Sequence, residues 1–201
     1  MAGRVLTVNG LPVSPGDHIC AFVRGRAERQ QLMLPFLREG VAAGEKCVCI
    51  VHASEHDQVV AAAGAGACEA GVLDMWDFES TYLRSGAFAG DNMLLFWKEW
   101  SHQTFEEEGW DFARGAMDMS WAETIASSRP VLDDFLDYEM QATRFARTYP
   151  QVALCIYDLE VFGGNVIFPV MKMHPKVLFS GILLDNPYYL DPDEVEVAVA
   201  G

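Results

Sequence analysis

The sequence has few basic residues and no long apolar segment. Its 14 Lys and Arg residues face 29 Asp and Glu residues, which gives a formal net charge of −15. Binding to DNA, RNA or an anionic membrane surface depends largely on Lys and Arg, so this composition disfavours direct contact with any of them. No segment approaches the roughly 18 uninterrupted apolar residues of a membrane span, and Met1–Leu6 lacks the pattern of a secretory signal. We therefore expect a cytoplasmic protein.

The cysteines form neither a disulfide framework nor a recognisable metal motif. There are five, Cys20, Cys47, Cys49, Cys68 and Cys155, and no two are spaced as CxxC. Their odd number and the apolar runs around them favour reduced thiols in the core. Cys47 and Cys49 would share one face of a strand, but no nearby histidine or cysteine completes a zinc ligand set. We therefore expect no bound metal and no cofactor.

The segment Asp17–Arg26 resembles the start of a nucleotide-binding domain but lacks its phosphate loop. An apolar run, Ile19–Val23, leads into a turn at Arg24 and Gly25, and a helical segment follows. A nucleotide-binding protein has a glycine-rich loop with Gly-Lys-Ser/Thr at this position, whereas this chain has one glycine between two arginines. We therefore predict a protein without catalytic residues. Arg24 and Arg26 could contact an anionic ligand at the helix N-terminus, or they could pair with surface carboxylates.

Strand and helix patterns alternate along most of the chain. Strands are predicted at Ile19–Val23, Cys47–Val51, Val72–Phe78, Asp111–Met119, Val152–Tyr157 and Val177–Leu184, the last as one strand or as a hairpin around Ser180 and Gly181. Helices are predicted at Glu28–Glu39, Ala53–Ala63 with Ser54 as its cap, Asp91–Glu108, Arg129–Tyr149 and Asn165–His174. This alternation predicts one α/β domain of three layers, in which helices cover both faces of a mostly parallel central sheet.

The residues that follow the predicted strands are candidates for a binding site. Ligands of such sheets bind outside the carboxyl ends of the strands, which here gather Arg24, Asp118, Ser120, Trp121, Tyr157 and Asp158. Asp158 has the form of a Walker B carboxylate, or it forms a turn. Met117–Trp121 offers Met and Trp side chains that would either line an apolar ligand site or fill the core. Ser120 lacks the Gly-x-Ser-x-Gly context of an exposed nucleophile, which argues against hydrolase activity.

Two further candidates, His18 and Cys20, belong to the first predicted strand of the sheet. They are two residues apart and would therefore share one face of that strand. They could bind a ligand such as a metal or haem, or they could be an ordinary histidine and cysteine of the core.

A set of short motifs spans most of the chain. The motifs are Asp17–Cys20, Leu34–Gly40, Gly44–Cys47, Met119–Ala122, Tyr138–Glu139, Tyr149–Pro150, Ala153–Asp158, His174–Pro175 and Asp185–Tyr189. Together, and in this order, they resemble the MEDS sensory-domain family of methanogens, methylotrophs and the regulator DcmR. We therefore divide the chain into an N-terminal extension (1–14), a MEDS-like domain (15–190) and an acidic tail (191–201). The chain departs from the family pattern at Asp118, where Glu commonly precedes Met-Ser-Trp.

The resemblance implies a RecA/KaiC-like fold and a role in sensing small hydrocarbon-like compounds. We therefore expect a non-catalytic sensor of small apolar molecules in signal transduction or transcriptional regulation. The sequence has no helix-turn-helix or kinase segment, so we expect it to act through a histidine kinase, an anti-sigma-type protein or a transcription regulator, with a homodimer also allowed. Two alternatives stay open: a nucleotide- or anion-responsive regulatory module descended from an ATPase, and a ligand-free protein-interaction scaffold.

Overall fold

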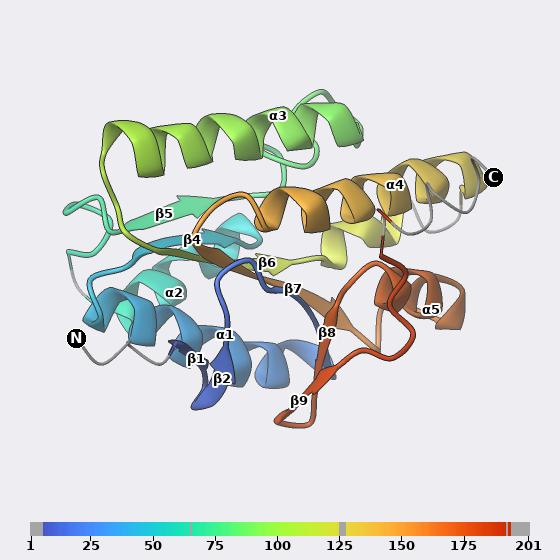
Figure 1. The fold of residues 1–201 in the computed structure, drawn as a ribbon, viewed down its shortest axis with the longest axis horizontal. Coiled ribbons are helices and arrows are strands. Elements are labelled where there is room, and N and C mark those ends of the chain that lie inside the picture. Colours follow the sequence, from blue (N-terminus) through green and yellow to red (C-terminus); the bar gives the residue numbers. More distant parts are fainter. Residues whose placement is uncertain (1–5, 65, 125–127, 192, 194–201) are drawn as a thin grey trace.

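The fold is built around one seven-stranded sheet (Figure 1). The computed structural model describes residues 6–64, 66–124, 128–191 and 193, so most of the predicted acidic tail lies outside the described residues. The strands, in their order across the sheet, are β5 (Leu73–Trp76), β4 (Lys46–Ile50), β6 (Ala113–Asp118), β7 (Gln151–Asp158), β3 (His18–Val23), β8 (Lys176–Phe179) and β9 (Ile182–Asp185). All neighbouring strands are parallel except β8 and β9. The predicted mostly parallel α/β sheet is confirmed.

Helices cover both faces of this sheet. In Figure 1, α3 (Gly90–Ser101) and α4 (Arg129–Ala146) lie above the sheet, while α1 (Gly25–Ala42) and α2 (His56–Ala63) lie below it. A fifth helix, α5 (Gly164–Lys172), contacts α4. Among the described residues, no helix combines the length and the apolar character that a membrane span needs.

The two faces of the sheet carry different side chains because neighbouring residues of a strand point to opposite sides. The odd-numbered residues of β6 and β7, such as Met117 and Tyr157, face α3 and α4 and join a core cluster that is rich in aromatic rings. The even-numbered residues, such as Ala116 and Ile156, face α1 and α2 and join an aliphatic cluster. The central strand β7 is buried along almost its whole length, as its apolar sequence predicts.

The Cys47 and Cys49 thiols both lie in the aliphatic cluster, and all five cysteines are free. The predicted reduced core thiols are therefore confirmed, although Cys68 is only partly buried. The β8–β9 turn at Ser180 and Gly181 has positive φ angles at both residues (49° and 76°), as a tight two-residue hairpin requires. Of the two arrangements considered for Val177–Leu184, the hairpin is the one that forms.

Two helix predictions were wrong, and one hairpin was not predicted. The helix expected at Ala53–Ala63 is divided into a 3₁₀ turn (Ala53–Glu55) and α2, and Ser54 is not its cap: the backbone N–H of Ser54 donates to Nδ1 of His52 at 3.2 Å. The helix expected to run to Glu108 ends as an α-helix at Ser101 and continues as a π-helical segment, His102–Glu107. The region 1–14 contains an unexpected hairpin of β1 (Leu6–Val8) and β2 (Leu11–Val13), which packs into the aliphatic cluster through Val8.

Candidate ligand-binding site

The turn between β3 and α1 replaces the phosphate loop with a loop held by carboxylates. Gly25 has a φ of 67°, and its N–H donates to Oδ1 of Asp158 at 2.9 Å. The same oxygen accepts from the N–H of Glu160, while Glu28 accepts from the N–H of Arg24. Free N–H groups at a helix N-terminus would bind phosphate, but here carboxylates already occupy two of them. This arrangement opposes the binding of another anion.

The two arginines proposed as anion contacts lie at the surface beside this turn. The Arg26 side chain is 56% exposed, and its Nε lies 3.3 Å from Oε2 of Glu55. Its Nη2 also donates to Gln58. Arg24 is exposed as well. Arg26 therefore pairs with α1–α2 side chains, which is the structural alternative that the sequence left open.

Next to the β3–α1 turn, a network of buried ion pairs connects the carboxyl ends of β4 and β6. Arg29 on α1 contacts Oε1 of Glu55 at 2.5 Å through Nη2 and Oδ2 of Asp118 at 2.7 Å through Nη1. Asp118 also accepts from the N–H and the hydroxyl of Ser120. Burial raises the pKa of Asp118 above its usual value, and Arg29 only partly opposes this shift. The sequence predicted Asp118 and Ser120 as neighbours but missed Arg29 and Glu55.

Trp121 lies on the opposite face of the sheet, among the aromatic rings. It is 4% exposed, and it stacks on Tyr82 with 4.4 Å between ring centroids. Phe88 and Phe135 contact it at 5.0 and 5.6 Å. The indole Nε1 is buried and has no hydrogen-bond partner among the described residues. Trp121 and Asp118 therefore do not share one surface.

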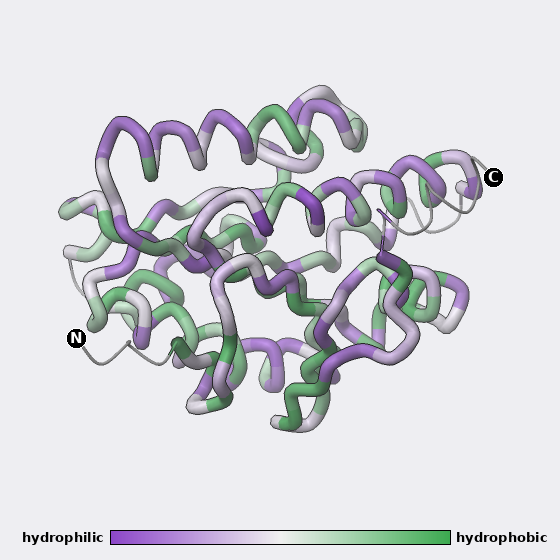
Figure 2. Tube along the Cα trace, viewed as in Figure 1, coloured by the Kyte–Doolittle hydropathy of each residue, from purple (hydrophilic) through white to green (hydrophobic). Residues whose placement is uncertain are grey.

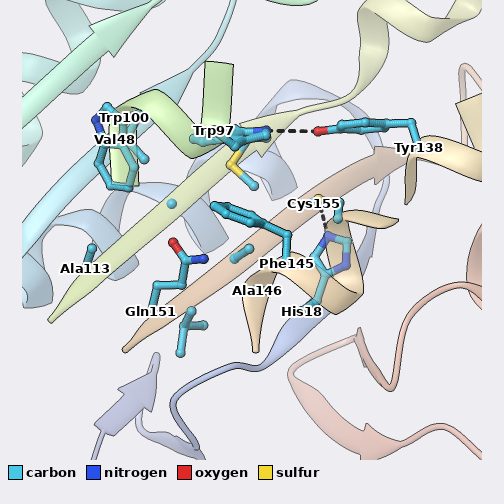
Figure 3. Close-up of a pocket in the computed structure, with 15 residues that line it drawn as sticks. His18, Val48, Trp97, Trp100, Ala113, Tyr138, Phe145, Ala146, Gln151 and Cys155 are labelled. Carbon is cyan, nitrogen blue, oxygen red and sulfur yellow. Dashed lines mark hydrogen bonds between the residues drawn. The ribbon is translucent and has the colours of Figure 1, made fainter. Parts of the chain in front are cut away.

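An apolar cavity of about 40 Å³ lies between the sheet and the helices α3 and α4 (Figure 3). Its wall includes Ala113 and Gln151, which are the first residues of β6 and β7, so it lies toward the amino ends of these strands. Trp97 and Tyr138 form part of the helix side, where the indole N–H of Trp97 donates to the Tyr138 hydroxyl at 2.9 Å. The full lining is His18, Val48, Trp97, Trp100, Ala113, Gly115, Met117, Tyr138, Ala142, Phe145, Ala146, Gln151, Val152, Ala153 and Cys155.

One end of this cavity meets a group of buried polar side chains. His18 and Cys155 line the cavity, and their Nε2 and Sγ atoms are 3.1 Å apart. Glu139 and His174 complete the group on its far side, and Tyr157 donates its hydroxyl to Oε1 of Glu139 at 3.0 Å. Burial lowers the pKa of His18 well below its usual value and raises the pKa values of Cys155 and Tyr157 well above theirs. At neutral pH these three groups are therefore uncharged.

The structure thus divides the predicted site residues among three places. Arg24, Arg26 and Asp158 lie at the β3–α1 turn, and Asp118 and Ser120 lie in the buried ionic network. His18, Cys20, Tyr157 and Trp121 belong to the α3/α4 face; Cys20 is fully buried there. The sequence analysis missed Glu139 and His174. The fold and its small apolar cavity define an α/β protein with a mostly parallel sheet, in which carboxylates stand where an ATPase would hold phosphate.

Comparison with known proteins identifies the family. The family described as MEDS, the methanogen/methylotroph, DcmR sensory domain, matches residues 17–175. The chain therefore belongs to the MEDS family. It is similar to the transcriptional repressor DcmR of Methylorubrum extorquens, with 25% identity over 187 residues that cover 83% of this chain. The matched region spans 61% of the length of that relative. These similarities support a regulatory sensory role.

A similar fold occurs in the flagellar accessory protein FlaH of Methanocaldococcus jannaschii. The TM-score is 0.57 at 11% identity, and the match covers 88% of this chain and 78% of FlaH. At this identity the likeness concerns the fold alone. This likeness agrees with the predicted α/β fold class, while the RecA/KaiC-like relationship stays a prediction.

Proposed function

We propose that this chain is a sensory domain that binds a small apolar molecule in the cavity beneath α3 and α4 and signals to a protein partner without catalysing a reaction. The cavity carries the proposal because its lining is mainly aliphatic and aromatic. A few polar groups, on His18, Tyr138, Gln151 and Cys155, interrupt that lining. Small-molecule sites combine an apolar wall with a few polar groups that orient the ligand.

The size of the cavity limits the ligand. A water molecule needs about 10–15 Å³ of such space, so a cavity of about 40 Å³ accepts roughly three groups of that size. This volume suits a compound of one to three carbon atoms with a small substituent, which is the lower end of the hydrocarbon-like class. A larger ligand would require α3 or α4 to move.

Such movement is also the means of signalling that we propose. The cavity lies between a rigid sheet and two helices that contact each other, so a ligand that prefers one spacing of helices and sheet would shift the population toward it. For the partner, the β8–β9 hairpin offers an apolar surface at the sheet edge, seen as green segments at the exposed hairpin in Figure 2. Phe179, Ile182 and Leu184 are 45%, 58% and 56% exposed there. An exposed apolar edge strand suits pairing with another chain, either a signalling protein or a second copy.

The Ala113→Val variant tests the cavity. In the wild-type protein, a bound alkane, alcohol or haloalkane of one to three carbons at a hundredfold excess over Kd should raise the Tm by about 5–10 °C. In Ala113→Val the two added carbon atoms fill the space, and we expect this shift to disappear. Differential scanning fluorimetry in sealed plates measures both.

Ala116→Val is the matched control. Ala116 lies on the same strand and is equally buried, with 0% exposure for both alanines, but it faces the aliphatic cluster on the opposite side of the sheet. It should show the cost of the two added carbon atoms without losing the ligand-induced shift. The proposal fails if no compound of the panel stabilises the wild type, or if the two variants respond alike.

The nucleotide-responsive alternative meets an electrostatic obstacle. Asp158, Glu160 and Glu28 surround the N-terminal N–H groups of α1, and their negative charges would repel a phosphate. Calorimetry with ATP and magnesium distinguishes this alternative, since binding that is lost in Arg24→Ala would support it. Partner capture that needs no small molecule would instead favour the scaffold alternative.

A further inference from the structure

We propose that His18, Glu139, Cys155 and His174 bind a divalent transition-metal ion of the zinc type. The four side chains come from β3, α4, β7 and the turn between α5 and β8. Their exposed fractions are 2%, 0%, 3% and 0% in that order. One ligand atom from each lies within 4.8 Å of all the others. Histidine nitrogen, thiolate sulfur and carboxylate oxygen are the donor atoms that zinc prefers.

The separations of the donor atoms fit a tetrahedral site. With metal–ligand bonds of about 2.0–2.3 Å, neighbouring donors in a tetrahedron lie about 3.3–3.8 Å apart. Nε2 of His18 is 3.1 Å from Sγ of Cys155 and 3.7 Å from Oε2 of Glu139. Nε2 of His174 is 3.3 Å from the same Glu139 oxygen. Three of the six donor separations are therefore close to the tetrahedral range, and all of the ligand atoms lie within 4.8 Å of one another.

Hydrogen bonds to the other ring nitrogens direct both histidines toward the site. The Thr143 hydroxyl donates to the Met173 carbonyl at 2.7 Å, so it accepts from Nδ1–H of His18 at 2.8 Å. Nδ1 of His174 lies 2.9 Å from the carbonyl oxygen of Val170, which can only accept. Both rings therefore carry a proton on Nδ1 and turn Nε2 toward the centre. This is the usual outer-shell pattern of histidines that bind metal.

Glu139 places a carboxylate oxygen at the centre of the group, 3.7 Å from Nε2 of His18 and 3.3 Å from Nε2 of His174. Glu139 Oε1 accepts from the Tyr157 hydroxyl, but Oε2 of Glu139 and Nε2 of His174 are buried without a hydrogen-bond partner among the described residues. These two atoms lie 3.3 Å apart, and buried unsatisfied groups are costly. A cation between them would satisfy both atoms, and its binding would release the thiol proton of Cys155.

The ion would lie at the wall of the apolar cavity, because His18 and Cys155 belong to both sites (Figure 3). The metal proposal does not depend on the ligand proposed for that cavity. Metal binding has its own measurement, and Ala113→Val should leave it unchanged.

Cobalt binding by the metal-free protein tests the proposal directly. After treatment with a chelator, titration with Co²⁺ should produce thiolate-to-cobalt charge-transfer absorption and the strong visible bands of a tetrahedral site, saturating at one ion per chain. Zn²⁺ should then remove these bands, and at a thousandfold excess over its Kd it should raise the Tm by about 8 °C or more. A spectrum that stays that of free Co²⁺, with no effect of Zn²⁺ on the Tm, would overturn the proposal.

Three variants test which residues hold and orient the ion. Cys155→Ala should abolish the charge-transfer band, whereas Cys20→Ala should keep it; Cys20 lies opposite Cys155 in the sheet and is equally inaccessible, but it is not part of the group. Thr143→Val keeps the shape of the side chain and removes the hydroxyl that accepts from His18 and donates to Met173, so we expect Zn²⁺ to bind about 10–100-fold more weakly. Equal affinity for Zn²⁺ in Thr143→Val and wild type, or an unchanged spectrum in Cys155→Ala, would contradict the assignment.

Discussion

Replacement of Arg29 by methionine is expected to lower the free energy of unfolding by about 3–5 kcal/mol, which corresponds to a fall in Tm of about 6–20 °C for a protein of this size. Arg29 is the cation between the buried carboxylates of Glu55 and Asp118. Its removal takes the facing charge from Asp118 and leaves Glu55 only the more exposed Arg26. Chemical denaturation followed by fluorescence of the tryptophans measures the loss.

The loss should also depend on pH. Burial already raises the pKa of Asp118 in the folded protein, and without Arg29 this pKa rises further. A carboxyl group with a raised pKa takes up protons on folding, so its contribution is most favourable below the unfolded pKa and is lost as pH rises through the folded pKa. We therefore expect Arg29→Met to be less destabilised at pH 5 than at pH 8.

Arg26→Met is the control for this prediction. Arg26 also contacts Glu55, but its side chain is more than half exposed, and exposed ion pairs contribute only about 0–1 kcal/mol. The change at Arg26 should therefore have little effect at either pH. Similar losses in the two variants would mean that the buried network does not stabilise the fold as we infer.

The strands could be predicted because each buried strand is a run of consecutive apolar residues. Val152–Tyr157 is apolar throughout and forms the centre of β7, and Ile19–Val23 forms β3 to within one residue. Helix ends were less predictable, since they depend on single contacts. The His52 side chain, which caps the turn before α2, gave no signal in the sequence that distinguished it from Ser54.

The polar groups of the interior could not be predicted from local patterns. His18, Glu139, Cys155 and His174 lie on four elements, and only the strand order places them together. Each residue, considered alone, is an ordinary buried side chain. Arg29 and Glu55 were missed for a related reason: charged residues on helices usually face solvent, and here the burial follows from the packing of α1 and α2 over the sheet edge. A signal was available at His18, whose place in an apolar strand already marked it as a candidate.

The position of the cavity could also not be predicted from the sequence. The rule that ligands bind at the carboxyl ends of parallel strands directed attention to Met117–Trp121, whereas the cavity begins at Ala113 and Gln151. It exists because Ala113, Gly115, Ala142 and Ala146 are small residues beneath large aromatic ones. Whether small residues leave a space depends on the distance between helix and sheet, which the sequence does not state.

Substitutions of Trp121 distinguish two positions for the ligand, the cavity beneath α3 and α4 and the carboxyl end of the strands. They should also have a large effect on stability. Trp121→Ala is expected to cost about 3–5 kcal/mol, since the indole contacts Tyr82, Phe88 and Phe135. Trp121→Phe should cost less, about 1–2 kcal/mol, because a ring stays in the stack and the lost indole N–H has no partner among the residues that the structure describes. Thermal and denaturant unfolding of the two variants give both values.

The response of Trp121→Phe to ligand then decides where the apolar molecule binds. Trp121 does not line the cavity beneath α3 and α4, so the ligand-induced rise in Tm should persist in Trp121→Phe and disappear in Ala113→Val. The reverse result would place the ligand beside the unpartnered indole N–H, at the carboxyl end of the strands where the sequence pattern first indicated a site. Because the phenylalanine variant keeps the aromatic stack, a lost response could not be attributed to unfolding, and the two sites would be separated by one substitution each.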